Sequence, residues 1–394
     1  MMILFAVILM DLLTGMEFDL FVPSFPELQA QFNLTPFWVE ALLSANFIGY
    51  CISLFFVGSL ADRYGRKPII LLGLLIFVIG SILCVSAPTY SCLLIGRFLQ
   101  GIGIAAPAIL SFLIIADSYA MKKQQFLLAM LNGSMNIAVA VSPLIGSYIA
   151  LYFQWRGNFV LLLILGLIVL LASVFFVPKY KLPEHKETIS LRGYLPLFKS
   201  KPLMLLMANI ILMIIPYWIF VGMSPLLYMK NLGVSLRHFG YYQGIFALVF
   251  ALGSILFGLM MHRYTQKKIL HVSGLVYLFS LITLVIATFW GNHNPLLITL
   301  AFLPFIISQI MPSTQLYPLC LNFMPQAKAK VSAMIQGGRL VFTALSLQIA
   351  SCFYEGSFRN IGIIISVVIF MAIVTHFFVL RNRELMTFAI SDQT

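Results

Sequence analysis

The sequence is poor in charge, and in acidic residues above all. Only 9% of its 394 residues are charged, whereas roughly 25% are charged in an ordinary soluble domain. Asp and Glu number 12 against 24 Lys and Arg, and hydrophobic residues make up 61% of the chain. A soluble core does not need this much apolar surface, so we expect most of the chain to contact lipid.

Cysteines are few, and enzyme signatures are missing. The five cysteines lie within or at the ends of apolar runs, with neither CxxC spacing nor a disulfide framework, so we interpret them as small hydrophobic residues. The sequence contains no HExxH, GxSxG, Walker loop or His/Cys metal cluster, and its six histidines lie apart. We therefore expect no enzyme activity, no cofactor and no metal site.

Long apolar runs take the place of these features. A membrane-spanning helix needs about 20 apolar residues, and twelve such runs predict an all-α membrane protein with twelve transmembrane helices. No basic segment precedes the first run and no small-residue cleavage site follows it, so we expect that run to remain as an anchor. The runs are 3–22, 37–60, 68–87, 91–115, 124–151, 157–177, 202–228, 238–261, 268–289, 295–317, 328–352 and 359–380.

The longest polar stretch follows the sixth run and divides the chain. It predicts an N-terminal six-helix half over 1–178, a linker over 179–201, and a C-terminal six-helix half with a short tail over 202–394. Within the linker, LRGYLPLF is interpreted either as a short amphipathic helix on the membrane surface or as plain linker.

The Lys and Arg residues predict the orientation. If the N-terminus is cytoplasmic, the cytoplasmic loops and tail hold eighteen of them and the opposite loops hold four. This bias predicts cytoplasmic N- and C-termini in an inner or plasma membrane. It also accounts for the net charge of +12 without nucleic acid as a partner.

The loop between the second and third runs reads GSLADRYGRKP. It closely resembles the signature loop of the major facilitator superfamily, and this resemblance implies that the loop helps to latch a cytoplasmic gate. A degraded echo at FGLMMHRYTQKK, 257–268, supports two related halves. The matching residues of the first loop are Gly58, Leu60, Asp62, Arg63, Gly65, Arg66 and Lys67.

The fourth run carries a cation in LLIGRFLQGIGIAA. Arg97 is costly within a membrane unless it faces a partner or water. The string resembles the superfamily's helix-four motif through Leu93, Arg97, Gln100 and Gly101, which implies that Arg97 takes part in proton coupling. The alternative is a structural Arg that extends outward.

The fifth run contains AVAVSPLIGS, which resembles the antiporter motif of exporters in the same superfamily. Pro143 and Gly146 match it, and Ser142 is among the small residues that replace the motif's other glycines. The resemblance implies export. The alternative is a helix that Pro bends for packing alone.

The first run holds three acids, in ILMDLLTGMEFDLFVP. On a helix, Asp11 and Asp19 lie about 80° apart around the axis and ~12 Å apart along it, whereas Glu17 lies about 160° from Asp19. We expect Asp19 to pair with Arg97, because both lie near the outer ends of their runs. Asp11 lies near the membrane midplane, where an ionised carboxylate is costly, and we interpret it as a carrier of protons.

The same segment resembles the D-x-x-x-P pattern of the Bcr/CflA-like drug:proton antiporters. Asp19 and Pro23 match, and Asp11 corresponds loosely to an acid that some related multidrug transporters carry two turns earlier. The resemblance implies proton-coupling roles for Asp19, Asp11 and Arg97, and Glu17 is a further candidate.

Polar and aromatic residues within the runs are candidates for a substrate cavity. Most buried amides in such proteins form interhelical hydrogen bonds instead. Arg339 is interpreted as an anion or substrate contact, as a partner of Asp11 or Glu17, or as an Arg bonded to backbone carbonyls. The cavity candidates are Asn132, Asn136, Tyr217, Trp218, Gln243, Gln309 and Arg339.

These features together predict a proton-coupled secondary transporter, acting as an exporter of small apolar or cationic compounds. The expected partners are a small-molecule substrate, protons and the lipid bilayer, and we expect a monomer. One alternative is an exporter or importer of a specific anionic metabolite or siderophore, which Arg339 would suit. A second is a receptor of the same fold without turnover, and a membrane enzyme is disfavoured by the missing catalytic cluster.

Overall fold

The computed structural model describes residues 2–119, 121–178, 194–260, 264–291, 293–324, 327–382 and 384–385. Within these ranges the chain is helical, with turns and short connections and no strand. The expected all-α class is therefore confirmed for the described residues. The predicted boundaries at 178 and 202 stay a prediction, because most of the linker lies outside these ranges.

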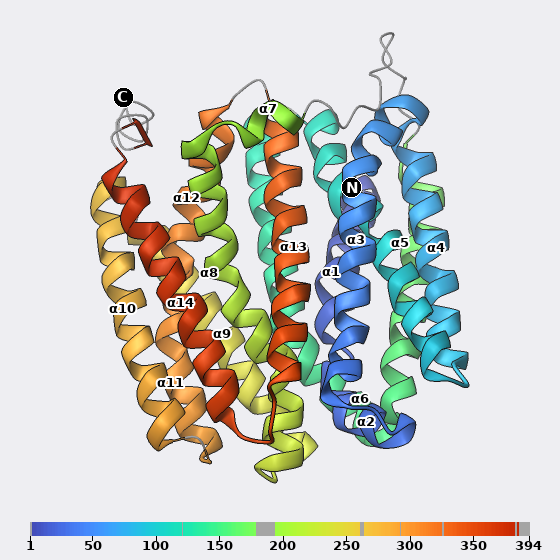
Figure 1. The fold of residues 1–394 in the computed structure, drawn as a ribbon. Helices are drawn as coiled ribbons and strands as arrows, with labels where there is room; N and C mark the ends of the chain where they lie inside the picture. The colour runs from blue at the N-terminus through green and yellow to red at the C-terminus, as the bar shows by residue number, and fades with distance from the viewer. Residues whose placement is uncertain are drawn as a thin grey trace. The chain divides into compact units, whose positions relative to one another are not determined.

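The chain forms two compact units, and the first consists of Met1–Ile189 with Ser235–Gly244. α5 packs against α3 and α4, while α1 packs against α6 and α5 (Figure 1). The elements of this unit are α1 (Met2–Asp19), η1 (Val22–Ser24), α2 (Phe25–Phe32), α3 (Pro36–Tyr64), α4 (Arg66–Ser86), α5 (Tyr90–Ser118) and α6 (Met121–Phe176).

The second unit consists of Ser190–Val234 and Ile245–Thr394. α8 packs against α13 and α14, and α10 packs against α11 and α14. Its elements are α7 (Leu195–Phe198), α8 (Lys201–Pro225), η3 (Leu226–Asn231), α9 (Leu236–Met260, whose first turns belong to the first unit), α10 (Gln266–Trp290), α11 (Pro295–Ser308), α12 (Ile310–Phe323), α13 (Lys328–Cys352) and α14 (Phe358–Arg381).

Close helix packing in the first unit depends on glycine. A Cβ on Gly101 of α5 would overlap the backbone carbonyl of Asn46 on α3. The absent side chain therefore lets the two backbones touch, as small residues do in membrane helix pairs. This contact brings Asn46 and Arg97 of α5 within hydrogen-bonding reach, as described below.

The second unit is held by aromatic packing. Phe220 of α8 stacks on Phe302 of α11 with ring centroids 4.2 Å apart, and it meets Phe246 of α9 edge-on at 5.3 Å. All three rings are almost fully buried. Stacked and edge-to-face pairs of this kind add to the gain from burying the rings themselves.

Each of the twelve predicted apolar runs lies on helical segments, with one difference in their limits. The runs 124–151 and 157–177 are the two parts of α6, and the predicted break between them falls at Gln154, where φ is 58° and ψ is −173°. The run 295–317 is instead divided into α11 and α12 at Gln309.

Two short helices lie outside the predicted runs. α2 was not predicted, although it begins with Pro26 in its first turn and Glu27 beside it, both of which favour a helix start. Glu27 accepts a hydrogen bond from the backbone N–H of Trp155 at 2.8 Å, and Gln31 accepts one from its indole N–H at 2.5 Å. α7 takes up LPLF of the predicted surface segment.

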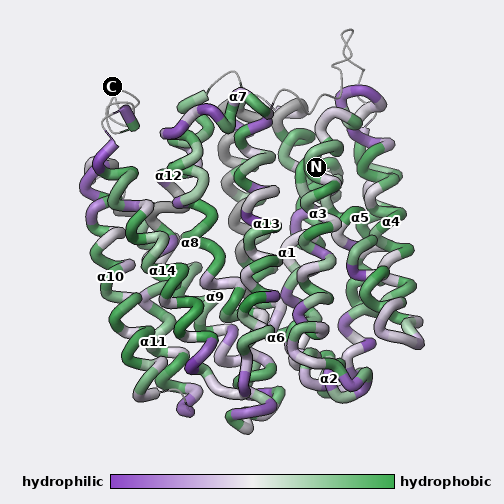
Figure 2. Tube along the Cα trace, in the orientation of Figure 1, coloured by the Kyte–Doolittle hydropathy of each residue, from purple (hydrophilic) through white to green (hydrophobic). Residues whose placement is uncertain are grey.

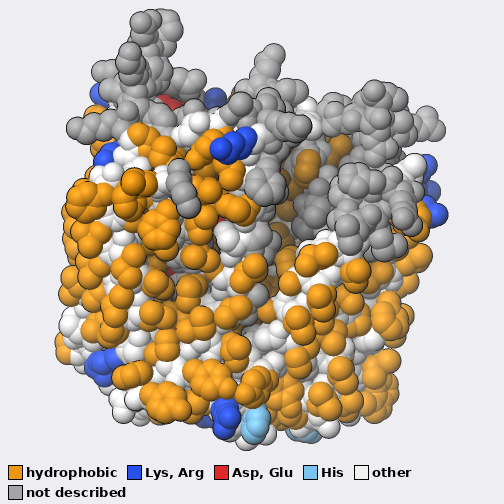
Figure 3. Space-filling model, turned by 180° about the vertical axis from the view of Figure 1, so that it is seen from behind, with side chains coloured by type: hydrophobic (Ala, Val, Ile, Leu, Met, Phe, Trp, Pro, Cys, Tyr) orange, Lys and Arg blue, Asp and Glu red, His pale blue; other side chains and the backbone are white. Residues whose placement is uncertain are grey.

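Apolar side chains cover the flanks of the helices. Eight of the described helices are long and apolar enough to cross a membrane. Figure 2 shows the hydrophobic residues along the helices and the hydrophilic ones gathered mainly towards their ends. Figure 3 shows a face that is mostly hydrophobic, with Lys and Arg side chains near its margins.

Candidate functional site

A buried ion pair lies inside the first unit. Arg97 on α5 donates from Nη1 to Oε1 of Glu17 on α1 at 2.9 Å, and both side chains are 0% exposed. α1 reaches this position because it packs directly against α5. A buried pair of this kind is stable only when further hydrogen bonds satisfy its remaining atoms.

Amide side chains supply part of that support. The Nδ2 of Asn46 on α3 donates to Glu17 Oε1 at 2.5 Å and to the backbone carbonyl of Arg97 at 3.1 Å. Arg97 Nη1 also donates to Gln100 Oε1 at 2.7 Å, and Gln100 Nε2 donates to Ser81 Oγ on α4 at 2.8 Å. The network thus joins four helices, α1, α3, α4 and α5.

Aromatic rings cover the guanidinium group. The Arg97 Cζ lies 4.1 Å from the ring centroid of Phe21 and 6.0 Å from that of Phe159. Among the described residues, Arg97 Nε and Nη2 and Glu17 Oε2 have no hydrogen-bond partner. The pair is therefore fully buried, and its hydrogen bonds are incompletely satisfied among the described residues, so removing either charge strongly affects the other.

The predicted pair of Asp19 with Arg97 is wrong, because Arg97 pairs with Glu17. Two helical residues turn the side chain by about 200°, so Glu17 and Asp19 leave α1 on different sides. Depth alone had suggested Asp19. Its carboxylate is nevertheless 0% exposed, and neither oxygen has a hydrogen-bond partner among the described residues.

Asp11 lies two turns earlier on α1 and is 1% exposed. Ser134 of α6 donates from Oγ to Asp11 Oδ2 at 2.8 Å, while Oδ1 has no partner among the residues that the structure describes. Its partner is therefore a neutral hydroxyl group of its own unit. Its proton-carrying role stays a prediction.

A fourth buried acid was not among the predicted site residues. Glu40 lies in the first turns of α3, is 0% exposed, and has no partner for either carboxylate oxygen within the described ranges. An acid inside a predicted membrane run is a functional candidate by default. The signal that identifies Glu40 is an acid within the predicted run 37–60.

The signature loop forms the connection between α3 and α4. Gly65 adopts φ 92° and ψ 154° there, a conformation open to glycine, whereas Gly58 lies inside α3 rather than in the turn. Lys67 donates from Nζ to the backbone carbonyl of Val174 on α6 at 2.7 Å, and the Arg63 guanidinium lies 5.4 Å from a neighbouring aromatic ring. Of the other motif residues, Asp62 lies in the last turn of α3 and Arg66 is the first residue of α4.

The antiporter-type segment packs against the end of α1. Ser142 donates from Oγ to the backbone carbonyl of Met16 at 3.1 Å, and Pro143 lies inside α6. A Cβ on Gly146 would overlap the carbonyl of Leu20. This segment therefore fixes how α1, with its acids, lies on α6.

The other cavity candidates are less informative. Tyr217 and Trp218 on α8 are half-buried with rings 5.6 Å apart. Gln243 on α9 is 5% exposed, and Gln309 lies at the junction of α11 and α12. Arg339 on α13 is partly buried. The side chains of Asn132 and Asn136 lie outside the described residues.

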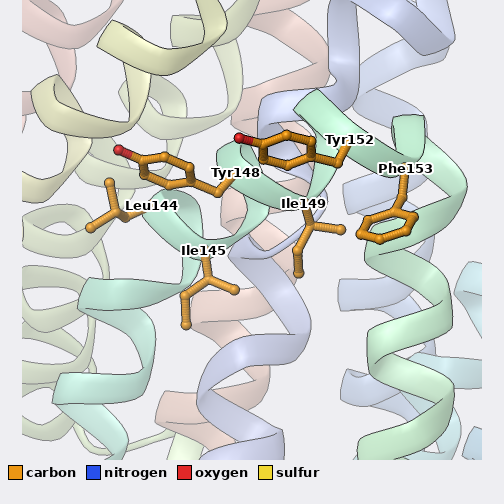
Figure 4. A pocket seen from close by; sticks show the side chains of 6 residues that line it. All are labelled: Leu144, Ile145, Tyr148, Ile149, Tyr152 and Phe153. Atoms are coloured by element: carbon orange, nitrogen blue, oxygen red, sulfur yellow. The ribbon is translucent and has the colours of Figure 1, made fainter.

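One hollow lies along α6 and is about 350 Å³ (Figure 4). The six residues that line it expose apolar surface only, and Figure 4 shows the Tyr148 and Tyr152 rings side by side. The Tyr148 hydroxyl lies 2.8 Å from that of Tyr241 on α9. A hollow along one helix without convergent polar groups does not orient a substrate. No group of metal-binding side chains occurs among the described residues.

Known proteins resemble the chain in sequence. The family model described as the Major Facilitator Superfamily matches residues 7–347. Multidrug resistance protein MdtL of Klebsiella pneumoniae subsp. pneumoniae is 26% identical over 278 residues, 68% of this chain and 69% of that protein. MdtL of Shewanella oneidensis is 27% identical over 286 residues, 72% of each chain.

Solved structures resemble it in fold. A D-xylose–proton symporter superposes with a TM-score of 0.74 at 17% identity, covering 95% of this chain and 96% of that one. A bacterial homologue of the human lysosomal transporter Spinster gives 0.74 at 16% identity, covering 96% of each chain. At such identities the likeness concerns the fold alone.

Proposed function

The chain belongs to the Major Facilitator Superfamily, and from this premise we propose that it is a proton-coupled exporter of small apolar or cationic compounds. Membership confirms the predicted fold class, an all-α membrane protein of the twelve-helix major facilitator type. The chain is thus a multi-pass membrane protein of a transporter family. The exchange of substrate for protons is our proposal.

The observation that carries the proposal is the buried group of Glu17, Asp19 and Arg97. Two carboxylates and one guanidinium carry a net charge of −1 when all are ionised, and an uncompensated charge is costly in an apolar interior. One added proton makes the group neutral. With Arg97 bound to Glu17 at 2.9 Å, we assign that proton to Asp19, whose oxygens have no other partner among the described residues.

This charge balance gives a mechanism for antiport. When Asp19 releases its proton, the group regains its negative charge and attracts a cationic substrate. A bound substrate cation and a bound proton are therefore alternatives at one site, which is what exchange requires.

The class of substrate is inferred from two sources. The cited relatives are named multidrug resistance proteins, and we extend that description to this chain. The acids on α1 favour cations over anions. The antiporter-type residues Ser142, Pro143 and Gly146 support export, since they hold α6 directly against α1.

The location and orientation follow from the charges of the loops. We propose that the protein lies in the bacterial inner membrane with both termini in the cytoplasm, since eighteen Lys and Arg fall on that side in the predicted topology and four on the other. The loop from Gly58 to Lys67 would then latch the cytoplasmic gate. We propose a monomer that needs only substrate, protons and lipid.

A second candidate function is transport of a specific anionic metabolite or siderophore. Arg339 on α13 favours it, because a partly buried guanidinium suits a carboxylate or phosphate. Substrate charge distinguishes the two candidates: cations compete for the acids of α1, whereas anions require Arg339.

Transport in proteoliposomes tests the proposal. Vesicles with an imposed proton gradient would be offered a panel of cationic, neutral and anionic compounds. We expect gradient-driven uptake of cations into inverted vesicles, its loss in Asp19→Asn, and its retention in the matched acid variant Glu355→Gln. Uptake of anions alone, lost in Arg339→Gln, would favour the second candidate. Binding without gradient-driven uptake or counterflow would support a receptor.

A further inference from the structure

The second unit contains a buried histidine that lies apart from the acids of α1. His376 lies on α14, near its end, and is 2% exposed. Its ring reaches Asn209 on α8 and the residues Leu270 and Ser273 on α10. Asn209 and Ser273 are 0% exposed. The imidazole is therefore enclosed where three helices meet.

Both ring nitrogens of His376 face oxygen atoms. Nδ1 lies 3.3 Å from Asn209 Oδ1, and Nε2 lies 2.8 Å from the backbone carbonyl of Leu270. Carbonyl and amide oxygens accept hydrogen bonds and do not donate them. A neutral imidazole has one N–H and can satisfy only one of these two oxygens, whereas the protonated ring satisfies both.

The orientation of the Asn209 amide is fixed by other contacts. Its Nδ2 donates to the backbone carbonyl of Ala372 at 2.9 Å and to Thr375 Oγ1 at 2.8 Å. The Thr375 hydroxyl is itself a donor to carbonyls of α14, so towards Asn209 it accepts. If the Asn209 amide were flipped, its Oδ1 would face the backbone carbonyl of Ala372, and two hydrogen-bond acceptors would be in contact. Asn209 Oδ1 therefore points at the ring.

The contact with α10 determines which ring nitrogen of the neutral His376 imidazole carries the hydrogen. Ser273 donates from Oγ to the carbonyl of Leu270 at 2.8 Å and lies 3.4 Å from His376 Nε2. A carbonyl has two lone pairs, so it accepts from both Ser273 and Nε2. The shorter contact therefore holds the Nε2 proton, and Nδ1 is the position that a further proton occupies.

We propose that His376 is a second proton-binding site, separate from the acids of α1, and that its bound proton links α14 to α8. With the proton on Nδ1, the ring donates to Asn209 and to Leu270 and bridges three helices. Without it, an imidazole lone pair faces Asn209 Oδ1 at 3.3 Å. The contact between α8 and α14 then becomes unfavourable, so their packing depends on pH.

The surroundings set the conditions for proton binding. The titratable neighbour on α10 is His271, an exposed residue whose Nδ1 lies 2.7 Å from the carbonyl of Lys267. No carboxylate among the described residues forms an ion pair with the ring. The other charged residues on the three helices are basic: Lys201 on α8, Lys267 and Lys268 on α10, and Arg359 and Arg381 on α14. Among the described residues, only Asn209 Oδ1 and the Leu270 carbonyl therefore favour the protonated ring, whereas the charged residues on these helices disfavour it.

The test is nitrogen NMR of the full-length protein labelled with ¹⁵N-histidine in lipid nanodiscs. His376→Gln assigns the ring signals. Between about pH 5 and 8, the range in which histidine switches charge, we expect Nδ1 to gain a proton as the pH falls while Nε2 stays protonated. Asn209→Leu should weaken proton binding to His376 about tenfold, equivalent to about 1.4 kcal/mol. The control variant His238→Gln, at an exposed site on α9, should leave the titration unchanged.

Two results would overturn the proposal. One is a His376 ring that keeps a single proton over the whole pH range in the parental protein, a measurement that needs no folded variant. The other is an Asn209→Leu protein whose ring titrates like the parental ring. Neither readout uses transport, so a failure here is distinguishable from a failure of the proposed antiport.

Discussion

Removing the positive charge of the buried ion pair should destabilise the protein more than almost any other single substitution. In Arg97→Ala, the Glu17 carboxylate stays 0% exposed and keeps, among the described residues, only the Asn46 amide as a hydrogen-bond donor. Gln100 Oε1 loses its 2.7 Å donor as well. Leaving one charge of a buried pair uncompensated costs about 3–5 kcal/mol, so we expect a loss of that size.

A double-mutant cycle separates the ion pair from simple loss of packing. Glu17→Gln removes the charge that Arg97→Ala leaves alone, so the double variant should recover part of the loss, with a coupling energy of about 1–3 kcal/mol. Arg97→Lys should be intermediate, because an ammonium group can reach the acceptors but does not stack on Phe21 at 4.1 Å as the planar guanidinium does.

Unfolding in mixed micelles titrated with SDS, followed by circular dichroism, measures these differences. The matched control is Arg359→Ala, which removes an exposed guanidinium at the start of α14 and should change stability by less than about 0.5 kcal/mol. Two results would contradict this reasoning. One is a stability loss in Arg97→Ala within about 1 kcal/mol of that in Arg359→Ala. The other is additivity of Arg97→Ala and Glu17→Gln, which would mean that the ion pair does not stabilise the contact among the four helices.

Three further predictions concern other parts of the first unit. Asp11→Asn should flatten the dependence of transport on pH, and Ser134→Ala, which removes the 2.8 Å donor, should shift that dependence without abolishing transport; an unchanged pH profile in both would make Asp11 a bystander. Burial raises the pKa of Glu27 above its ordinary 4.5, so its contribution to stability is full below pH 4.5 and falls as the pH rises through the raised pKa. Glu27→Gln should remove this decline from the plot of unfolding temperature against pH. A plot for the variant that runs parallel to that of the parental protein would contradict the assignment. Gly146→Ala should cost about 1–3 kcal/mol because its Cβ meets backbone, whereas a Cβ on Gly58 meets no atom within 4 Å and Gly58→Ala should be nearly neutral in the same unfolding assay.

The helical architecture was predictable because apolar runs of about 20 residues have few other solutions in lipid. The runs predicted the interruption between 151 and 157, which falls at Gln154, but not the division of 295–317 at Gln309. Beside the break at Gln154, Trp155 donates hydrogen bonds to Glu27 and Gln31 of α2, a segment distant in sequence. α2 itself was missed because its eight residues are too short to span a membrane.

The site was predictable in its residues but not in its pairing. An acid or a cation within an apolar run is a functional candidate, which identified Asp11, Glu17, Asp19 and Arg97. The choice between Glu17 and Asp19 as the partner of Arg97 depends on which side of α1 faces α5. Depth along the helix carries no information about that rotation, so an argument from depth favoured the wrong acid. Glu40 could be identified from the sequence by the same rule, because it is an acid within the second predicted run.

Proton movement measured together with substrate movement tests the central claim most directly. Proteoliposomes containing the protein and an internal pH indicator would receive a cationic substrate on one side, with no imposed gradient. We predict that inward movement of the substrate drives protons outward, and that Asp19→Asn abolishes this proton flux while its circular dichroism stays that of the folded protein. Substrate movement without any proton flux in the parental protein, or an undiminished flux in Asp19→Asn, would contradict the account.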